Sequence, residues 1–399
     1  MNTALPALLP PQPWTQTAAG TALLSALDAG NGRTRLVGGA VRDALLGLVC
    51  NDIDLATRLT PDQVMLRLKA AGLKAVPTGI AHGTVTAVAA GLIAEVTTLR
   101  RDVQGFGRQA QVAFTDDWQA DAARRDFTIN ALYADLPGGE LHDATGGLAD
   151  LAARRVRFIG DPLQRIAEDH LRILRFFRFS ARFAAVIDAD GLTACTTRAN
   201  DLMALSRERI AMELRLLLGL PDPVPILAVM LAAGIFRPVL PELSDARLPV
   251  LATTIAAEAA AAVPVAWERR LAALLPAGDT STAADVVARL KLSNPQRARI
   301  VAAVQPPAPP PHLAAAYGDG AQAVVDRLLI AGHAGAAQPL IGWQRPRLPA
   351  SGKDIIARGV APGPAVAQRL GVFERAWVAA GFPGDAAIIA DMLDAAARG

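Results

Sequence analysis

Two acidic residues in the first third of the chain have the type and spacing for metal-assisted phosphate chemistry. Asp52 and Asp54 stand at i and i+2 of a β-prone run, so their carboxylates should project from one face of a strand. Like charges at this distance repel, and a divalent cation removes the repulsion because Mg²⁺ takes oxygen ligands and binds beside substrate phosphates. Two such ions can activate an attacking hydroxyl and stabilise a leaving pyrophosphate. We therefore predict that Asp52 and Asp54 are catalytic and hold two Mg²⁺ ions.

A glycine turn precedes this acidic pair. Gly38 and Gly39 follow a β-prone run, and residues 40–46 have the pattern of a short helix whose first turn carries Arg42. Two glycines let backbone N–H groups approach a phosphate closely, and the helix N-terminus adds a partial positive charge. The fork-shaped guanidinium of Arg42 can donate to the same anion. A lone Gly-Gly pair is more often a plain tight turn, but beside the acidic pair we expect a triphosphate site.

The elements that must position these residues change character along the chain. From residue 162 onward helical periodicity replaces the β-prone pattern, and the remainder is rich in Ala and Leu. A proline-rich stretch, residues 305–312, predicts a helix break or stiff linker. We therefore predict an α+β head followed by a long helical part. The β-prone runs of the head are residues 35–37, 52–56, 83–88 and 93–98.

The composition excludes several classes of protein. The chain has 399 residues, 52% of them hydrophobic, and a net charge of +3, which argues against intrinsic disorder. Its two cysteines, Cys50 and Cys195, lie far apart and match neither a disulfide scaffold nor a zinc site, which favours a reducing, cytoplasmic location. The most apolar stretch, residues 251–267, is broken by Glu258 and Pro264, so we expect no membrane span.

The charges are unevenly distributed. Residues 31–150 carry 12 basic and 14 acidic side chains, whereas residues 151–220 carry 12 arginines and 8 acids. Only four of the 40 basic residues are lysines, and arginine suits bidentate recognition of phosphates and base edges. Genomic base composition is an equally good explanation of the arginine excess. An acidic head beside a basic neck would nevertheless suit a metal site next to an anionic polymer.

The string GGAVRDALLG followed by NDIDLAT resembles the signature of the nucleotidyltransferase superfamily, specifically class II tRNA nucleotidyltransferases (CCA-adding enzymes) and bacterial poly(A) polymerases. The resemblance covers residues 33–220 and beyond them extends only to helical character. Further blocks resemble the family in the same order: PTGIAHGTVTAV, EVTTLRRD, RRDFTINALY, RIAEDHLRILRFFRF and LSRERIAMEL.

The resemblance implies an α+β fold with a small nucleotidyltransferase head, whose mixed sheet is rich in antiparallel pairs, followed by an all-helical neck, body and tail. The implied divisions are an N-terminal helical extension (1–30), the catalytic head (31–155), a neck that recognises the nucleotide base (156–220), a helical body (221–304) and an RNA-binding helical tail (305–399).

The block RRDFTINAL contributes the implied ribose site. In the family this block selects ribose over deoxyribose, which implicates Arg125 and Asp126 with Asn130 as a supporting polar group. An arginine and an aspartate can together bind a triphosphate and a sugar hydroxyl, since one donates and the other accepts. In isolation the same residues would more often be an exposed helix start.

A helix expected over residues 165–183 would carry the base site. Glu168 and Arg172 are spaced i, i+4 and Asp169 and Arg172 i, i+3, which could be an ordinary intrahelical salt bridge. The resemblance instead implies a protein template, in which Asp169 and Arg172 present an acceptor and donors to the incoming base and Glu168 orients Arg172. Cytosine and adenine offer an amine beside an accepting ring nitrogen, whereas uracil and guanine place a carbonyl there, so C and A are selected by ~1–3 kcal/mol.

Several other residues also have an expected role. Arg175 and Arg178 follow at helical spacing and are candidates for phosphate or RNA contacts. Glu95 is either a third carboxylate near the metals or a structural partner for an arginine. His82 is expected to be structural. Ser206 has the character of a helix N-cap.

The implied function is addition of C, C and A from CTP and ATP to the 3′ end of tRNA with release of pyrophosphate. The expected partners are tRNA, CTP and ATP, without a membrane. A poly(A) polymerase, or an enzyme that adds only CC or only A, is the alternative within the superfamily. A non-catalytic RNA-binding module is the alternative from another class, although binding alone would not need the clustered carboxylates.

Overall fold

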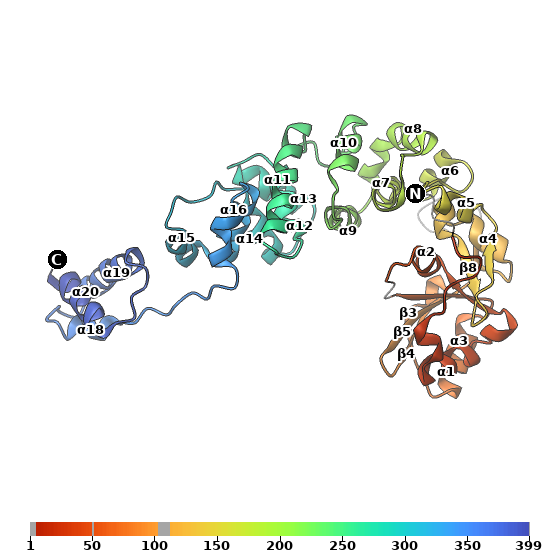
Figure 1. Ribbon diagram of the computed structural model, residues 1–399, viewed down its shortest axis with the longest axis horizontal. Coiled ribbons are helices and arrows are strands. Elements are labelled where there is room, and N and C mark those ends of the chain that lie inside the picture. Colours follow the sequence, from red (N-terminus) through yellow and green to blue (C-terminus); the bar gives the residue numbers. More distant parts are fainter. Residues whose placement is uncertain (1–4, 50–51, 103–111, 399) are drawn as a thin grey trace. The chain divides into compact units, whose positions relative to one another are not determined.

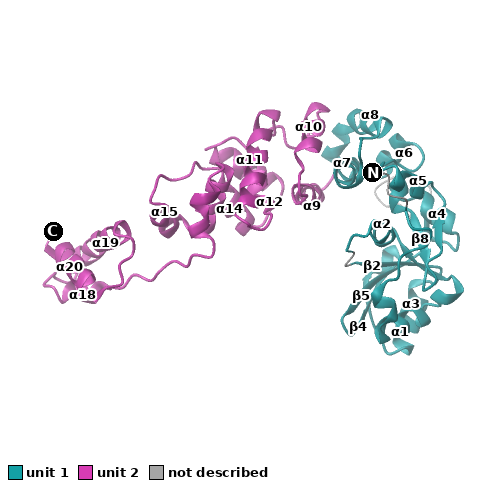
Figure 2. Ribbon diagram, viewed as in Figure 1, with its two compact units in different colours: residues 1–204 teal, residues 205–399 magenta. Residues whose placement is uncertain are grey.

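The computed structural model describes residues 5–49, 52–102 and 112–398. Cys50 and residues 1–4 of the predicted N-terminal extension therefore lie outside the described residues. The chain divides into two compact units, residues 1–204 and 205–399, which Figure 2 colours separately. The finer divisions drawn from the sequence stay predictions.

A seven-stranded mixed sheet forms the centre of the first unit. Its strand order is β3-β4-β5-β2-β1-β8-β9, and among the pairs formed by described residues only β2–β5 is parallel. The predicted α+β class with an antiparallel-rich sheet is confirmed, as are the four predicted strands. The strands are β1 (Thr34–Val37), β2 (Ile53–Thr57), β3 (Lys74–Gly79), β4 (Thr84–Ala89), β5 (Leu92–Thr98), β8 (Leu132–Asp135) and β9 (Leu141–Asp143), and a separate hairpin pairs β6 (Arg100–Asp102) with β7 (Val112–Phe114).

Some helices of the first unit pack on this sheet, and others follow it along the chain (Figure 1). Helix α3 contacts β3, β4 and β5, and α1 packs against α3. Helix α2 follows β1 directly, as the glycine turn predicts, and contacts β1, β2 and β8. The helices of this unit are α1 (Ala18–Ala26), α2 (Gly39–Leu45), α3 (Pro61–Ala70), α4 (Trp118–Ala123), α5 (Gly147–Ala152), α6 (Pro162–Glu168), α7 (Arg172–Phe183) and α8 (Ala189–Thr197).

The helix predicted over residues 165–183 is interrupted, so that prediction was wrong. Helix α6 ends at Glu168 and α7 begins at Arg172. Between them Asp169 adopts an extended conformation, with φ −150° and ψ 105°, and its carboxylate accepts a hydrogen bond from the Leu171 backbone N–H at 3.2 Å. Aspartate side chains compete with helical hydrogen bonds in this way, although Glu168 and Arg172 still pair across the break at 2.6 Å.

A cluster of phenylalanines packs α7 against the head. Phe127 lies 5.0 Å from Phe158 and 5.5 Å from Phe179 between ring centroids, and Phe158 stacks on Phe176 at 5.4 Å. Phe127, Phe158 and Phe176 are almost fully buried. Buried aromatic rings contribute large apolar areas, so this cluster holds the first residues of α7 in place beside the sheet.

Helices are the only regular secondary structure among the described residues of the second unit, as predicted. Ser206 caps α9 by accepting from the Arg209 N–H, and no helix occupies residues 305–311, so both predictions are confirmed. The helices are α9 (Arg207–Leu218), α10 (Val224–Ala232), α11 (Leu248–Ala260), α12 (Trp267–Leu274), α13 (Thr280–Arg289), α14 (Asn294–Ala303), α15 (His312–Asp319), α16 (Ala321–Ile330), α17 (Ala334–Ala337), α18 (Gly352–Ile356), α19 (Pro364–Ala379) and α20 (Ala386–Arg398).

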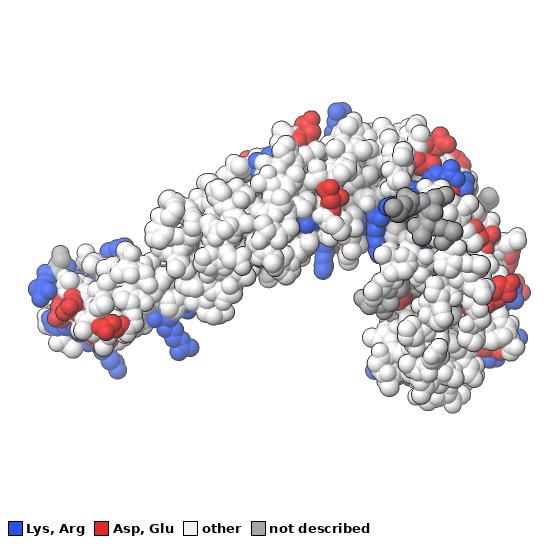
Figure 3. All heavy atoms as spheres, in the orientation of Figure 1, with Lys and Arg blue, Asp and Glu red and all other residues white. Residues whose placement is uncertain are grey.

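Two features of the second unit bear on its surface and stability. On the face shown in Figure 3, charged side chains gather over α18–α20, while the surface over α14–α16 is largely uncharged. Inside the unit, Arg270 is buried and pairs with Glu258 at 2.8 Å.

Across all described residues, every helix is too short or too polar to span a bilayer.

Candidate functional site

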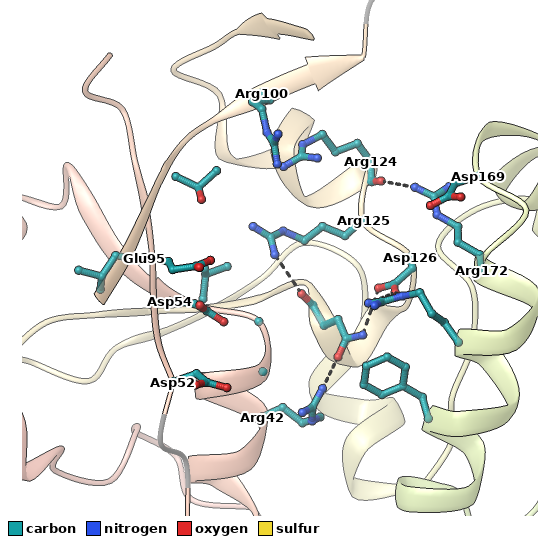
Figure 4. A pocket seen from close by; sticks show the side chains of 18 residues that line it. Arg42, Asp52, Asp54, Glu95, Arg100, Arg124, Arg125, Asp126, Asp169 and Arg172 are labelled. Atoms are coloured by element: carbon teal, nitrogen blue, oxygen red, sulfur yellow. Dashed lines mark hydrogen bonds and ion pairs between the residues drawn. The ribbon is translucent and has the colours of Figure 1, made fainter. Parts of the chain in front are cut away.

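A pocket of about 650 Å³ in the first unit collects most of the residues singled out in the sequence (Figure 4). It is lined by strand ends, the turn before α2, the segment after α4 and the start of α7. Among the predicted site residues, Glu168 and Arg178 do not line it. Those that do are Gly38, Gly39, Arg42, Asp52, Asp54, Glu95, Arg125, Asp126, Asn130, Asp169, Arg172 and Arg175.

The glycine turn forms one end of the pocket. Gly38 has φ 66° and ψ −122°, a backbone conformation that residues with a Cβ rarely adopt. A Cβ there would also lie 3.3 Å from the Asn130 carbonyl oxygen. Both constraints explain why glycine occupies the junction between β1 and α2 and why the backbone lies open to the pocket.

Arg42 extends from α2 into this end of the pocket and is nearly buried. Its Nε donates to Asp43 at 2.8 Å, its Nη1 donates to Asn130, and its guanidinium lies 4.2 Å from the centroid of the Phe183 ring. Burial lowers the pKa of Arg42. These contacts hold the guanidinium in one orientation.

Three carboxylates line the adjoining wall. Asp52 directly precedes β2, Asp54 lies within it, and Glu95 on β5 is the parallel register partner of Asp54. Burial, together with the nearby charges of Glu95 and Asp52, raises the pKa of Asp54 to about 6. The predicted strand position of Glu95 is confirmed. A cation would relieve the repulsion, and hard oxygen ligands suit Mg²⁺, so the donor set fits this ion.

A second set of possible metal ligands has its ligand atoms close together. Among the described residues, only the ligand atoms of Asp135, Glu140 and His142 all lie within 4.8 Å of one another. Asp135, however, already accepts from Arg35 at 2.7 Å and contacts His142 at 2.8 Å. The protein itself neutralises Asp135, so we regard this group as an ion pair of the β8–β9 hairpin.

The residues after α4 form the wall opposite the carboxylates. Arg125 donates to Asp121 at 2.9 Å and to the Tyr133 hydroxyl at 3.1 Å. Asp126 accepts from the Asn130 amide at 3.1 Å and pairs with Arg175 of α7 at 2.6 Å. Although burial opposes it, Arg175 and the hydrogen bonds lower the pKa of Asp126, which keeps it ionised.

The interrupted helix supplies the remaining wall. Arg172 donates through Nη1 to Glu168 at 2.6 Å and to the Arg165 carbonyl at 2.8 Å, and through Nη2 to the Arg124 carbonyl at 2.9 Å. Asp169 and Arg172 line the pocket, while Glu168 stands behind Arg172. Arg178 lies 4.4 Å from the centroid of the Phe179 ring.

The sequence reasoning missed several residues of the pocket. Arg100, Arg124, Thr97 and Phe179 also line it. Asp121 lies beneath it and is 1% exposed; although burial opposes this, Arg125 and Arg124 lower the pKa of Asp121 to about 2. The spacing of Asp121 from Arg124 (i, i+3) and Arg125 (i, i+4) could have indicated this cluster.

Two stretches of the chain match known domain families. Residues 34–157 match the poly A polymerase head domain, and residues 186–247 match a domain described as the probable RNA and SrmB-binding site of polymerase A. The first match contains the glycine turn and all three carboxylates.

Curated relatives match about half of the chain. The mitochondrial CCA tRNA nucleotidyltransferase 1 of Danio rerio is 46% identical over 188 residues, covering 46% of this chain and 43% of the relative. The human protein of that name is 45% identical over 195 residues, covering 47% and 44%. The CCA-adding enzyme of Levilactobacillus brevis is 39% identical over 203 residues, covering 50% of each. The matched region thus spans half of the length of these relatives or less.

Solved structures are similar over nearly the whole chain. The Bacillus stearothermophilus CCA-adding enzyme in complex with CTP has a TM-score of 0.73 and 27% identity, covering 95% of this chain and 98% of that one. The Thermotoga maritima CCA-adding enzyme complexed with tRNA has a TM-score of 0.66 at 20% identity, covering 94% of each, which is a likeness of fold.

Proposed function

Because residues 34–157 match the poly A polymerase head domain, we propose that the chain is a template-independent nucleotidyltransferase that adds C, C and A to the 3′ end of tRNA. The observation that carries the proposal is one pocket with three carboxylates on one wall and an acceptor–donor pair, Asp169 and Arg172, on another. Binding RNA alone would need neither set.

In this proposal the two ends of the pocket receive different parts of CTP or ATP. Gly38, Gly39 and Arg42 bind the triphosphate, which suits an open glycine backbone and an oriented guanidinium. Arg125 and Asp126 contact the ribose, with Asn130 linking Asp126 to Arg42. The terminal ribose hydroxyl of tRNA attacks the α-phosphorus, and pyrophosphate leaves.

The carboxylates are proposed as the metal ligands. Asp52 and Asp54 would hold two Mg²⁺ ions, with Glu95 beside them, and when bound the ions neutralise charge on the attacking and leaving oxygens. The raised pKa of Asp54 supports this role, since the protein places a carboxylate where its own charge is costly.

Base selection is proposed for Asp169 and Arg172. The aspartate accepts from the exocyclic amine of cytosine or adenine, and the guanidinium donates to the adjacent ring nitrogen. Glu168 and the Arg124 carbonyl hold Arg172 from behind, which supports a fixed donor direction. Arg175 and Arg178 are proposed to contact phosphates of nucleotide or RNA, the former while paired with Asp126.

Two further elements of the sequence prediction remain part of the proposal. The helical second unit is proposed to bind tRNA through phosphates and shape, because duplex RNA offers little else to read. A cytoplasmic location is retained as a proposal, although two of the relatives are named as mitochondrial proteins.

A primer-extension assay tests this function against its alternatives. The purified chain is given Mg²⁺, a tRNA lacking its 3′ terminus, and labelled nucleotides singly and together. Products that require both CTP and ATP and stop after three additions support the proposal. A long series of extension products with ATP alone would indicate a poly(A) polymerase. Addition limited to CC or to A would indicate a CC-adding or A-adding enzyme. The absence of any product would indicate a non-catalytic RNA-binding module.

A further inference from the structure

Two arginine side chains that the proposed chemistry does not use face each other at one end of the pocket. Figure 4 shows the guanidinium groups of Arg100 and Arg124 pointing toward one another. They approach from different elements, because Arg100 begins β6 and Arg124 follows α4. Both contact the same carboxylate oxygen, since the Arg100 backbone N–H (3.1 Å) and the Arg124 Nε (2.9 Å) donate to Oδ1 of Asp121.

Asp121 pairs with more than one guanidinium group. The other oxygen of Asp121 accepts from Arg125 at 2.9 Å and from the Tyr133 hydroxyl at 2.7 Å, so one carboxylate contacts the guanidinium groups of both Arg124 and Arg125. Arg100 donates in addition to the His82 carbonyl at 2.6 Å, a neutral acceptor. Two guanidinium groups held together beside a polar pocket form a favourable site for a phosphate, which arginine binds through parallel hydrogen bonds.

The position of this pair suits one phosphate of the reaction better than the others. In Figure 4, Arg42 lies at one end of the pocket, Arg100 and Arg124 lie at the other, and Asp54 and Glu95 lie between them. In phosphoryl transfer the attacking and leaving oxygens are roughly in line, on opposite sides of the phosphorus. If pyrophosphate leaves toward Arg42 and the glycine turn, the attacking hydroxyl comes from the Arg100 end.

We propose that Arg100 and Arg124 bind the backbone phosphodiester adjacent to the terminal ribose of the RNA acceptor strand. The inference rests on the proposed function, because it assigns the RNA strand to the side opposite the leaving group. The two arginines position the strand so that its 3′-hydroxyl reaches the α-phosphorus beside Asp54. Arg124 also connects this phosphate site to the base site, since its carbonyl accepts from Arg172.

The test separates RNA binding from nucleotide binding. Arg100→Met and Arg124→Met are compared with Arg101→Met, a matched control because Arg101 is exposed, is adjacent on β6 and does not line the pocket. We expect KM for a tRNA lacking its 3′ terminus to rise at least about tenfold in the first two variants, with KM for CTP within about twofold of wild type. Arg100→Lys and Arg124→Lys, which keep the charge but lose the fork, should be intermediate.

Equilibrium binding of tRNA gives a readout that does not depend on catalysis. Each methionine variant should reduce the slope of log K against log salt by about 0.7, the value for one phosphate contact on a single strand, and Arg101→Met should not. A rise in KM for CTP with unchanged tRNA binding would overturn the inference and assign the pair to the triphosphate. The inference would also be overturned if Arg100→Met and Arg124→Met had the same KM for tRNA and the same salt slope as Arg101→Met. If wild type binds tRNA but adds no nucleotide, the proposed function fails, while the salt slopes still test the contact.

Discussion

Asp54 on β2 and Glu95 on β5 are direct register partners across the one parallel strand pair of the sheet. Two carboxylates therefore stand side by side in a pocket, and burial together with Glu95 and Asp52 raises the pKa of Asp54 to about 6. The fold thus keeps a local repulsion that a bound cation would relieve, and this relationship leads to the first two predictions.

Cation binding should depend on pH in the range where Asp54 titrates. Because a proton and a metal ion compete for its carboxylate, affinity for Mn²⁺ should be nearly constant above pH 7 and fall toward tenfold per pH unit below about 6. Titration of Mn²⁺ by electron paramagnetic resonance at several pH values measures this. An affinity that stays level down to pH 5 would contradict the role of Asp54.

Neutralising Asp54 should stabilise the metal-free protein. The folded state holds the Asp54 proton more tightly than the unfolded chain does, so this residue makes wild type less stable as pH rises from 3.8 to about 6. Allowing for partial solvent screening, Asp54→Asn should raise the free energy of unfolding by ~1–2 kcal/mol at pH 7 in EDTA. The gain should vanish below pH 4. Urea unfolding at both pH values checks it, and a loss of stability at pH 7 would refute it.

Removing the other metal ligand should separate chemistry from RNA binding. Asp52→Ala is expected to abolish nucleotide incorporation while tRNA binding stays within about twofold of wild type, because the proposed RNA contacts lie elsewhere. Single-turnover incorporation and filter binding measure the two quantities. Parallel loss of both would argue against a metal-ligand role for Asp52.

The fork of Arg172 should determine base selection. Arg172→Lys retains the charge but loses the paired donors, so the preference for CTP over UTP should fall by about 10- to 100-fold, corresponding to ~1–3 kcal/mol. Competition between labelled CTP and UTP measures this ratio. Arg178→Lys is the control, since Arg178 does not line the pocket, and it should leave the ratio unchanged. An equal change in both variants would remove Arg172 from the base site.

The buried ion pair of the second unit should affect stability. Arg270 pairs with Glu258 at 2.8 Å and donates to the Leu218 carbonyl, also at 2.8 Å, which connects α12 to the end of α9. Arg270→Met leaves Glu258 with a more distant partner, Arg269 at 3.6 Å, and should cost about 3 kcal/mol in unfolding free energy. Denaturant unfolding measures it. Glu242→Gln, at a partly exposed pair with Arg289, is the control and should cost ~1 kcal/mol or less.

The local sequence pattern predicted the main elements of the head correctly. The strands, the glycine turn and α2 follow from short-range chemistry, and the acidic pair stands next to the strand that presents it. The same local pattern failed at residues 169–171. Helical periodicity continues through this segment, but the Asp169 carboxylate binds the Leu171 N–H and ends the helix.

The parts of the site that the sequence did not indicate depend on contacts between distant segments. Arg172 is oriented by the Arg124 carbonyl, 48 residues earlier, and Asp126 pairs with Arg175, 49 residues later. Asp121 was overlooked because a lone aspartate before two arginines is common on exposed helices. The spacing can indicate its pairs with Arg124 and Arg125, but not that Tyr133 and the backbone of Arg100 also converge on it.

The most direct test of the proposed function is which nucleotides the pocket accepts and how many are added. A tRNA ending before its last three nucleotides is incubated with the purified chain, Mg²⁺ and equal concentrations of all four nucleoside triphosphates, and the product is analysed by mass spectrometry. We predict one product that gains two cytidylates and one adenylate. A product with uridylate or guanylate, or an extended run of adenylates, would contradict it.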